Sequence, residues 1–337
     1  PLKKLISIIV IYKNNFKKIT ITFILKMIMN RYEKIIQKFK SNQLVLLDGG
    51  IGTELEKRGL KMDATWCGSS SLQTQILTKL HMDYINAGSN IITTNTYASS
   101  RIMLESGNFG NKFHEINIKA IECAKNAREI LNKKDVLIAG SISHRYPIAD
   151  GDLNSNASIN VSDSQLKESC EEMSKLLCDN GCDIILLEMM YHPERMQIVF
   201  DSIKNINKPV WVGFSARKSD DNKILSLSDS IDLPFNELIQ IIKYYHIDCV
   251  GIMHSSLDII GECIEIIKQN FSGPLMVYPD SGKFISPNWI FDEIISPKEF
   301  SLLAKGWFNI GVQVIGGCCG LSPEHIQAVY KSEYLKQ

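Results

Sequence analysis

From residue 43 onward, short runs of apolar residues alternate with longer segments in which apolar positions recur every three or four residues. The short runs are continuous, which is typical of parallel strands that are buried on both faces. The longer segments have the spacing of amphipathic helices. Strands are predicted at residues 44–47, 90–94, 136–139, 183–187, 210–214, 249–253, 275–278 and 312–315.

The segments between and after these strands predict helices at residues 72–87, 113–131, 164–179, 193–206, 236–245, 257–269, 297–308 and 323–334. Repeated β-α units imply right-handed crossovers and a parallel sheet, and eight such units favour a closed barrel. The glycines at 49, 50 and 52 lack the spacing of a dinucleotide-binding fingerprint. The pattern therefore predicts an α/β protein, a single (β/α)₈ TIM barrel that spans residues 33–337.

Residues 1–32 differ from the rest because they contain seven Lys or Arg residues and no Asp or Glu. The apolar stretch 6–12 is shorter than the roughly 20 residues that cross a bilayer. We interpret this leader as a disordered segment, a targeting segment or a translated upstream stretch, and it does not enter the fold argument.

Charge and cysteine content narrow the class of protein. The chain has 37 basic and 37 acidic residues, a balance that argues against a nucleic-acid or polybasic membrane surface. Nine cysteines without regular spacing indicate a reducing compartment, so we predict a cytoplasmic enzyme with neither nucleic acid nor membrane as partner. Structural roles are expected for Cys67, Cys123, Cys170, Cys178, Cys182, Cys249 and Cys263.

Polar residues follow several of the predicted strands, where a (β/α)₈ barrel carries its catalytic groups. Asp48 follows the first strand, Glu188 ends the fourth, His254 ends the sixth, and Cys318 and Cys319 follow the eighth. We expect these side chains to converge on one rim of the barrel. A structural role is the alternative for each: a turn for the aspartate, a buried ion pair for the glutamate, a loop position for the histidine.

The segment Gly316-Gly317-Cys318-Cys319-Gly320 carries the most specific chemistry. Neighbouring residues on a strand point to opposite faces, whereas on a glycine-flanked turn both sulfurs can face one small volume. Such a pair suits a soft metal held by thiolates, above all zinc. Two incidental buried thiols are the alternative.

Together these motifs resemble the homocysteine S-methyltransferase family. Residues 47–55 match its opening motif, residues 81–97 are similar to its second-strand unit, and residues 316–326 match its C-terminal signature. Residues 277–282 resemble its Tyr-Pro-Asn-(Ser/Ala)-Gly segment, with Asp280 in place of the usual Asn. The resemblance runs from about residue 43 to 332, in the family's order.

The resemblance implies a zinc-dependent (β/α)₈ barrel that methylates the sulfur of homocysteine. Zinc would deprotonate the substrate thiol, whose thiolate is the nucleophile. Asp48 and Glu188 would hold the substrate's ammonium group, and amides near Gly49, Gly50 and Thr94 would receive its carboxylate. The methyl donor would be S-methylmethionine, S-adenosylmethionine or a betaine.

Two departures from the family pattern bring a histidine to the rim. His254 stands where the family has a third zinc cysteine, and Ser143-His144 replaces Gly-Pro after the third strand. Three interpretations follow. His254, Cys318 and Cys319 bind zinc; or zinc is lost and His144, His254 and Glu188 serve other chemistry; or the chain is a non-catalytic binding protein.

Overall fold

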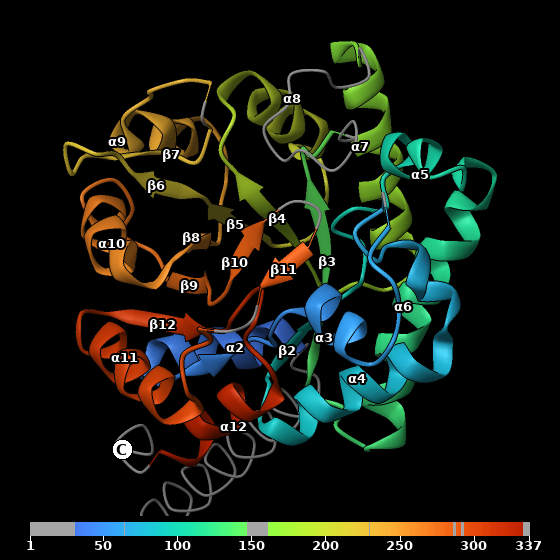
Figure 1. The fold of residues 1–337 in the computed structure, drawn as a ribbon, viewed down its shortest axis with the longest axis horizontal. Helices are drawn as coiled ribbons and strands as arrows, with labels where there is room; N and C mark the ends of the chain where they lie inside the picture. Colours follow the sequence, from blue (N-terminus) through green and yellow to red (C-terminus); the bar gives the residue numbers. More distant parts are fainter. Residues whose placement is uncertain are drawn as a thin grey trace, which may run out of the picture.

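A computed structural model describes residues 31–63, 65–146, 161–228, 230–285, 288–290 and 293–332. Eight parallel strands form one sheet in the order β1-β12-β9-β8-β5-β4-β3-β2 (Figure 1). Residues 1–30 of the predicted leader lie outside the described residues, and the first described helix begins at Arg31.

Every predicted strand is present. The strands of the sheet are β1 (Val45–Leu46), β2 (Ile91–Thr93), β3 (Leu137–Ser143), β4 (Ile184–Met190), β5 (Val210–Phe214), β8 (Cys249–Ser256), β9 (Leu275–Asp280) and β12 (Val312–Ile315). β3, β4 and β8 continue beyond their predicted ends into polar residues. The prediction relied on runs of apolar residues, whereas hydrogen bonding to neighbouring strands extends further along the chain than those runs.

Main-chain and side-chain hydrogen bonds join β1 to β2 and complete the barrel. The Leu46 N–H donates to Asn90 Oδ1 at 3.0 Å, and the Asn90 N–H donates to the Leu46 carbonyl at 2.7 Å. Further along, the Thr93 N–H donates to Asp48 Oδ2 at 2.6 Å. The predicted (β/α)₈ barrel is therefore confirmed, with polar side chains closing its seam.

The helices are α2 (Arg31–Lys40), α3 (Ile51–Lys57), α4 (Thr74–Ala87), α5 (Arg101–Ser106), α6 (Phe113–Ile130), α7 (Asp163–Asp179), α8 (Pro193–Ile203), α9 (Phe235–Leu238), α10 (Ile260–Lys268), α11 (Pro297–Asn309) and α12 (Pro323–Lys331). Local signals explain several ends. Ser162 and Ser296 cap α7 and α11 through capping boxes, and Gly88 ends α4 with φ +114°. The predicted helix at 236–245 is instead the short α9 followed by the 3₁₀ helix Ile239–Tyr244.

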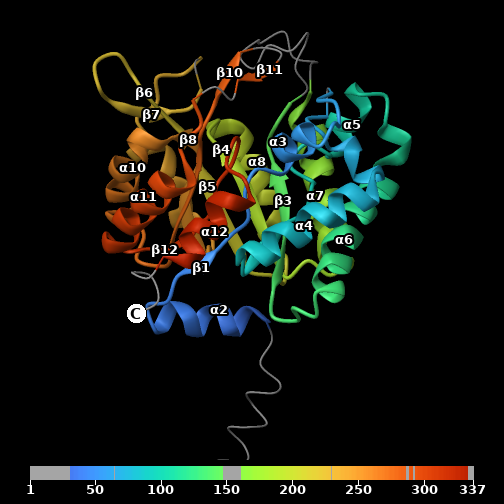
Figure 2. The same ribbon diagram turned by 60° about the horizontal axis from the view of Figure 1, so that its bottom comes forward.

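Two apolar layers hold the barrel together. Inside it, the side chains of alternate strand residues pack on one another, among them Val45, Leu186, Trp211 and Met276. α2 lies across the N-terminal end of the barrel (Figure 2), where Trp211 Nε1 donates to the Tyr32 hydroxyl at 3.2 Å. The outer layer packs the surrounding helices onto the strands. With its N-terminal end covered by α2, the barrel leaves its other end for a site.

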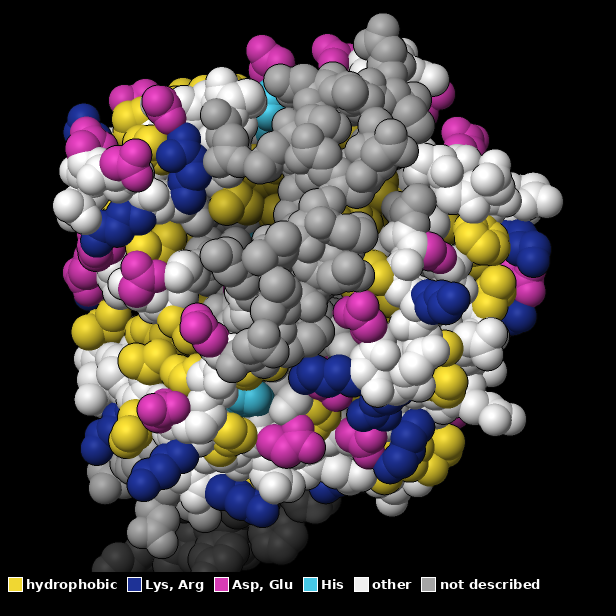
Figure 3. All heavy atoms as spheres, in the orientation of Figure 1, with side chains coloured by type: hydrophobic (Ala, Val, Ile, Leu, Met, Phe, Trp, Pro, Cys, Tyr) yellow, Lys and Arg dark blue, Asp and Glu magenta, His cyan; other side chains and the backbone are white. Residues whose placement is uncertain are grey.

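Two antiparallel hairpins stand at that other end, opposite α2 (Figure 2): β6 (Ala216–Lys218) with β7 (Ile224–Ser226), and β10 (Lys283–Ile285) with β11 (Asn288–Ile290). On the face shown in Figure 3, basic and acidic side chains are interspersed among the described residues. Of the helices that the structure describes, none has the length and apolar character needed to cross a membrane.

Candidate metal centre and substrate cavity

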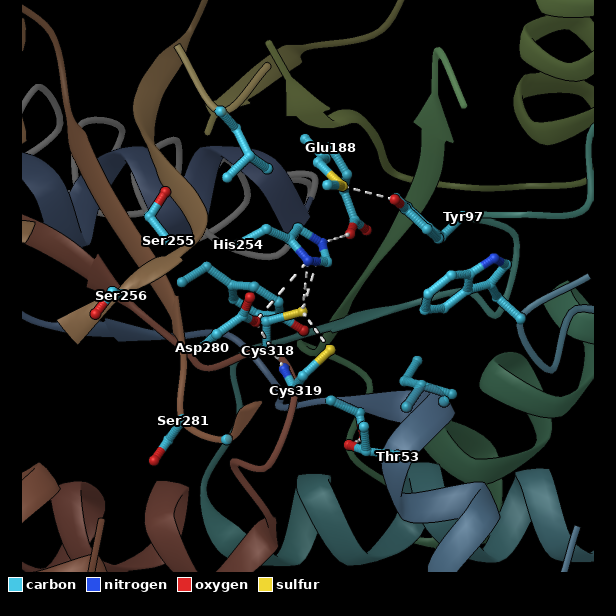
Figure 4. Close-up of a pocket in the computed structure, with 18 of the residues that line it drawn as sticks. Thr53, Tyr97, Glu188, His254, Ser255, Ser256, Asp280, Ser281, Cys318 and Cys319 are labelled. Atoms are coloured by element: carbon cyan, nitrogen blue, oxygen red, sulfur yellow. Dashed lines mark hydrogen bonds and ion pairs between the residues drawn. The ribbon is translucent and has the colours of Figure 1, made fainter. Parts of the chain in front are cut away.

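A cavity of about 720 Å³ opens at the C-terminal ends of the strands. Its wall includes six residues that carry chemistry: Glu188, His254, Asp280, Cys318, Cys319 and Arg145. His254, Asp280, Cys318 and Cys319 lie close together at the cavity wall (Figure 4). This is the rim on which the sequence predicted convergence, and the convergence of Glu188, His254 and the cysteine pair is observed.

The cysteine loop follows β12 and is tied to β9 by backbone hydrogen bonds. The Cys318 N–H donates to the Pro279 carbonyl at 2.8 Å, and the Ser281 N–H donates to the Cys319 carbonyl at 2.8 Å. The two sulfurs lie 3.8 Å apart. Adjacent residues thus present both thiols to one volume, as the glycine-flanked turn predicted.

Glycines are required where this loop meets its neighbours. Gly320 has φ +82°, and a Cβ there would lie 1.6 Å from the Ser281 carbonyl oxygen. A Cβ on Gly50 would lie 2.5 Å from the Cys318 carbonyl oxygen. Only residues without a side chain allow the loops after β1, β9 and β12 to pack this closely.

A bulge at the end of β8 directs His254 toward the sulfurs. The pairing with β9 shifts between Met253 and Ser256, and His254 has φ +46°, an uncommon value for a residue other than glycine. The hydroxyls of Ser215 and Ser255 both donate to the Met253 carbonyl at 2.8 Å, which fixes the distorted backbone. Strain of this kind concentrates at functional sites.

Four potential metal ligands meet at this point. The ligand atoms of His254, Asp280, Cys318 and Cys319 all lie within 4.8 Å of one another. Cys318 Sγ is 3.2 Å from His254 Nδ1, and Asp280 Oδ1 is 3.9 Å from the same nitrogen (Figure 4). Asp280 Oδ1 also accepts the Cys319 N–H at 3.0 Å, which orients the carboxylate. The structure therefore places Asp280 as a fourth candidate beside the three ligands predicted from the sequence.

Cys318, Asp280 and His254 hold their protons more tightly than usual, because they lie close together in a buried site. Burial raises the pKa of the Cys318 thiol well above its usual value, and the neighbouring Cys319, Asp280 and Glu188 raise it further. Burial also raises the pKa of Asp280. Burial lowers the pKa of His254, but Cys319 and Glu188 outweigh this and raise it to about 10. A divalent cation among these donors would lower the pKa of the thiols and allow them to bind it as thiolates, so the donor set fits a metal.

Glu188 reaches the cavity through a second bulge. The pairing of β4 with β5 shifts between Leu187 and Met190, and Met189 has φ +55°. Glu188 Oε2 lies 3.5 Å from His254 Nε2, and its side chain is 8% exposed. The carboxylate is thus placed on the cavity wall beside the imidazole, as predicted for a group at the mouth of the barrel.

Asp48 is fully buried and is not among the residues that line the cavity. Its Oδ2 accepts the N–H and hydroxyl of Thr93 at 2.6 and 3.0 Å, and its Oδ1 lies 3.2 Å from the Tyr278 hydroxyl. Burial raises the pKa of Asp48 to about 7 despite these hydrogen bonds. In this structure its carboxylate ties β1 to β2 and β9, and its predicted contact with a substrate ammonium stays a prediction.

The amides predicted to receive a carboxylate are partly engaged. The Gly50 N–H donates to the Leu321 carbonyl at 3.0 Å, and the Thr94 N–H donates to the Ala139 carbonyl at 2.9 Å. Gly50 and Thr94 line the cavity, whereas Gly49 is packed beneath it against Leu321 and Tyr84. Their predicted role is not tested by this geometry.

His144 does not join the site. It is 1% exposed, and its Nε2 accepts the N–H groups of Tyr191 and His192 at 3.1 and 3.3 Å. Burial lowers its pKa to about 3, so it is neutral. His144 therefore fixes the loop after β4. It is not one of the described residues that line the cavity.

Three further residues of the cavity wall escaped the sequence analysis as functional candidates: Trp66, Tyr97 and Arg145. The Tyr97 ring stacks on His254, with centroids 5.4 Å apart, and its hydroxyl lies 2.8 Å from the sulfur of Met189. The guanidinium of Arg145 lies 4.5 Å from the Trp66 ring centroid. Tyr97 ends the segment 81–97 that resembles the family's second-strand unit, whereas no pattern distinguishes Trp66 or Arg145 along the chain.

Comparisons with known proteins show what this chain is similar to. The chain is 29% identical over 311 residues to homocysteine S-methyltransferase 2 of Zea mays, covering 86% of this chain and 89% of the relative. It is 25% identical over 320 residues to selenocysteine methyltransferase of Astragalus bisulcatus, covering 87% and 93%. Both relatives are thus matched over nearly their whole length.

The fold also matches a solved structure. The metallated form of the homocysteine methyltransferase MmuM from Escherichia coli aligns with a TM-score of 0.70 at 22% identity, covering 89% of this chain and 99% of that one. This likeness supports the barrel architecture. A sequence profile of the homocysteine S-methyltransferase family matches residues 45–332, and this chain therefore belongs to that family.

Proposed function

We propose that this protein transfers a methyl group to the thiol of homocysteine, with zinc held by Cys318, Cys319, His254 and Asp280. One observation supports the metal centre above all others: two thiols, an imidazole and a carboxylate lie within 4.8 Å of one another. Nitrogen, sulfur and carboxylate oxygen are the donors that zinc takes in proteins, usually four at a time.

When bound, zinc would lower the pKa of the substrate thiol and hold it as the nucleophilic thiolate. Four protein donors leave no position for that sulfur, so one of them must be exchangeable. Asp280 is the natural candidate, because its carboxylate is the hardest donor of the set while the thiolates and imidazole suit zinc better. Cys318, Cys319 and His254 would then remain as the permanent ligands.

Glu188 is the group best placed to hold the ammonium of an amino acid. Its buried carboxylate lines the cavity and lies 3.5 Å from His254, one side chain away from the sulfurs. Asp48 lies behind the cavity wall and would support this role by fixing Thr93 and Tyr278. This arrangement is consistent with a thiol amino acid whose sulfur points at Cys318.

The reaction itself is a nucleophilic displacement. The substrate sulfur forms a bond to the donor's methyl carbon, the bond from that carbon to the donor's cationic sulfur or nitrogen breaks, and the electron pair stays with the donor. Tyr97 offers aromatic surface for the cationic centre of such a donor. S-methylmethionine, S-adenosylmethionine and a betaine all carry a centre of this kind.

The deciding experiment measures zinc in protein purified without added metal, followed by methyl transfer to homocysteine from each of the three donors. About one zinc per chain is expected, with methionine formed from at least one donor. The matched control is the Cys318→Ser/Cys319→Ser variant, which should contain no zinc. Absence of zinc from the unmodified protein after reconstitution under reducing conditions would refute the metal centre, and zinc without methyl transfer would refute the reaction.

A further inference from the structure

Arg145 borders the cavity just beyond the end of β3. Its backbone is anchored, because the Arg145 N–H donates to the Ser143 hydroxyl at 3.3 Å and that hydroxyl donates to the Tyr97 carbonyl at 2.7 Å. The residue is only 6% exposed. A charged side chain buried to this extent ordinarily has a partner of opposite charge.

Within the part of the chain that the structure describes, one edge of this guanidinium has no such partner. Its Nε and Nη2 are buried and make no hydrogen bond. These two nitrogens carry the parallel N–H groups of one side of the fork, the geometry that binds both oxygens of a carboxylate. Leaving them unpaired costs free energy that a bound anion would recover.

The same edge of another arginine shows what it binds when it is satisfied. Arg101 Nε donates to Glu172 Oε2 at 2.7 Å, and Arg101 Nη2 donates to Glu172 Oε1. That carboxylate is supplied by the protein. At Arg145 the corresponding pair of donors faces no protein carboxylate among the described residues, although the side chain borders a cavity large enough for small molecules.

The surroundings of Arg145 indicate an anion rather than a cation as ligand. Its guanidinium lies over Trp66, 4.5 Å from the ring centroid, so a positive charge already occupies one face of that ring. Tyr97 interacts with both this region and the candidate metal ligands. Its ring stacks on His254, and the Arg145 charge partly offsets the rise that burial causes in the pKa of Tyr97.

We infer that Arg145 is the receptor for the carboxylate of an amino-acid ligand in this cavity, a specificity determinant that deepens the proposed methyl transfer and rests on it. Both the methyl donor and homocysteine carry such a group. The donor is favoured as the source, because Arg145 packs on Trp66, outside the group of candidate metal ligands, whereas the thiol's own amino-acid group belongs beside those ligands and Glu188. A donor with its methyl toward the sulfurs and its carboxylate on Arg145 would span the cavity.

The test is calorimetric titration of the zinc-loaded protein, which needs no turnover. The probes are S-methylmethionine, homocysteine and the carboxamide of each, in which the carboxylate charge is removed and the rest is retained. The variants are Arg145→Gln, which removes the charge, and Arg145→Lys, which keeps the charge but loses the fork. The matched control is Arg217→Gln, since Arg217 also lines the cavity but is paired with Asp232 at 2.6 Å.

Arg145→Gln should weaken S-methylmethionine binding by about tenfold or more, the usual effect of losing hydrogen bonds to a charged group. It should also abolish the preference for the carboxylate over the carboxamide and leave homocysteine affinity within about twofold. The S-methylmethionine affinity of Arg145→Lys should lie between those of Arg145→Gln and the unmodified protein, and the affinity of Arg217→Gln should equal that of the unmodified protein. The same loss confined to homocysteine would keep Arg145 as a carboxylate receptor and assign it to the thiol substrate.

The inference would be overturned if Arg145→Gln bound both S-methylmethionine and homocysteine as tightly as the unmodified protein does. It would also be overturned if Arg145→Gln lost the same affinity for the carboxamide of a probe as for its carboxylate form. Failure of the unmodified protein to bind either compound would do the same. Thermal unfolding provides the folding control: among the described residues the Nε–Nη2 edge of this buried guanidinium makes no hydrogen bond, so its replacement should not lower the melting temperature. Normal ligand binding without methyl transfer would count against the proposed reaction and leave this inference standing.

Discussion

Cys318 Sγ lies 3.2 Å from His254 Nδ1, although 64 residues separate them in the chain. The cysteine follows β12 and the histidine ends β8, and β9 lies between these two strands in the sheet. Contact across an intervening strand requires both side chains to lean toward the barrel axis. The bulge at the end of β8 and the glycine-rich turn after β12 provide this, and Asp280 at the end of β9 completes the group.

Loss of the imidazole should weaken zinc binding. His254→Ala is expected to lower zinc affinity by at least about tenfold, because even the loss of an outer partner of a metal ligand costs about 10–100-fold. His254→Cys should retain zinc, since a thiolate restores the family's ligand set. His254→Asn serves as the folding control, because asparagine tolerates the positive φ that His254 adopts. Competition with a chelator measures the affinity, and unchanged binding by the alanine variant would remove His254 from the ligand set.

Asp280→Asn tests the fourth donor. The amide oxygen can still accept the Cys319 N–H, so the loop should keep its conformation while the negative charge is lost. If Asp280 binds the metal, the visible absorption of the cobalt-substituted protein should change in the variant even without substrate. Asp258→Asn is the matched control, because Asp258 lines the same cavity but lies outside the ligand group. Identical spectra for Asp280→Asn and the unmodified protein would exclude coordination by Asp280.

Glu188→Gln should separate substrate binding from metal binding. Removal of its charge is expected to raise the KM for homocysteine by about tenfold or more, through a lost hydrogen bond to a charged ammonium, with zinc content unchanged. Glu293→Gln is the control, since Glu293 also lines the cavity but is solvent-exposed. Parallel losses of substrate affinity and zinc would indicate a general folding defect.

Asp48 should make stability depend on pH. Its pKa is about 7 in the folded protein, against 3.8 for an unperturbed aspartate, so the folded state holds this proton more tightly than the unfolded state does. Stability from this group is therefore greatest below about pH 4 and declines as pH rises toward 7, by up to about 4 kcal/mol. Asp48→Asn should flatten that decline and unfold no more easily at pH 8. Urea unfolding between pH 4 and 8 measures this, and parallel curves for the two proteins would contradict it.

Gly50 and Gly52 provide a matched pair for the packing beneath the thiols. A Cβ on Gly50 would lie 2.5 Å from the Cys318 carbonyl oxygen, whereas the nearest atom to a Cβ on Gly52 is 3.6 Å away. Gly50→Ala should therefore destabilise the protein by about 1–3 kcal/mol and reduce zinc content. Gly52→Ala, inside α3, should be neutral or stabilising by up to about 1 kcal/mol. Denaturant unfolding with metal analysis distinguishes the two, and equal effects would show that the contact at Gly50 is unimportant.

Residues that share an apolar run or a short motif were predicted well. The run 312–315 is β12 and the run 210–214 is β5, each with the predicted bounds. The turn at 316–320 brings both sulfurs together, and the family and its thiol methyltransferase activity are confirmed. The cytoplasmic location stays a prediction.

Residues whose role depends on distant neighbours were predicted less well. His144 and His254 both follow strands, yet only His254 reaches the cavity, because a bulge redirects it while His144 is held by the loop after β4. Bulges arise from pairing between strands and leave no trace in the periodicity of one strand. Arg145 and Trp66 meet only because β3 and the loop after α3 border the same cavity.

Local patterns along the chain were enough to predict the alternation of strands and helices, the barrel that this alternation favours, and the chemistry of the cysteine turn. These depend on local periodicity and on adjacent residues, which the chain states directly. Packing in three dimensions was needed to show that Asp280 lies within reach of the candidate metal ligands, that Asp48 is buried at the barrel seam, and that among the described residues one edge of Arg145 makes no hydrogen bond. Each of these depends on which side chains from distant strands come into contact. Closure of the barrel determines those contacts.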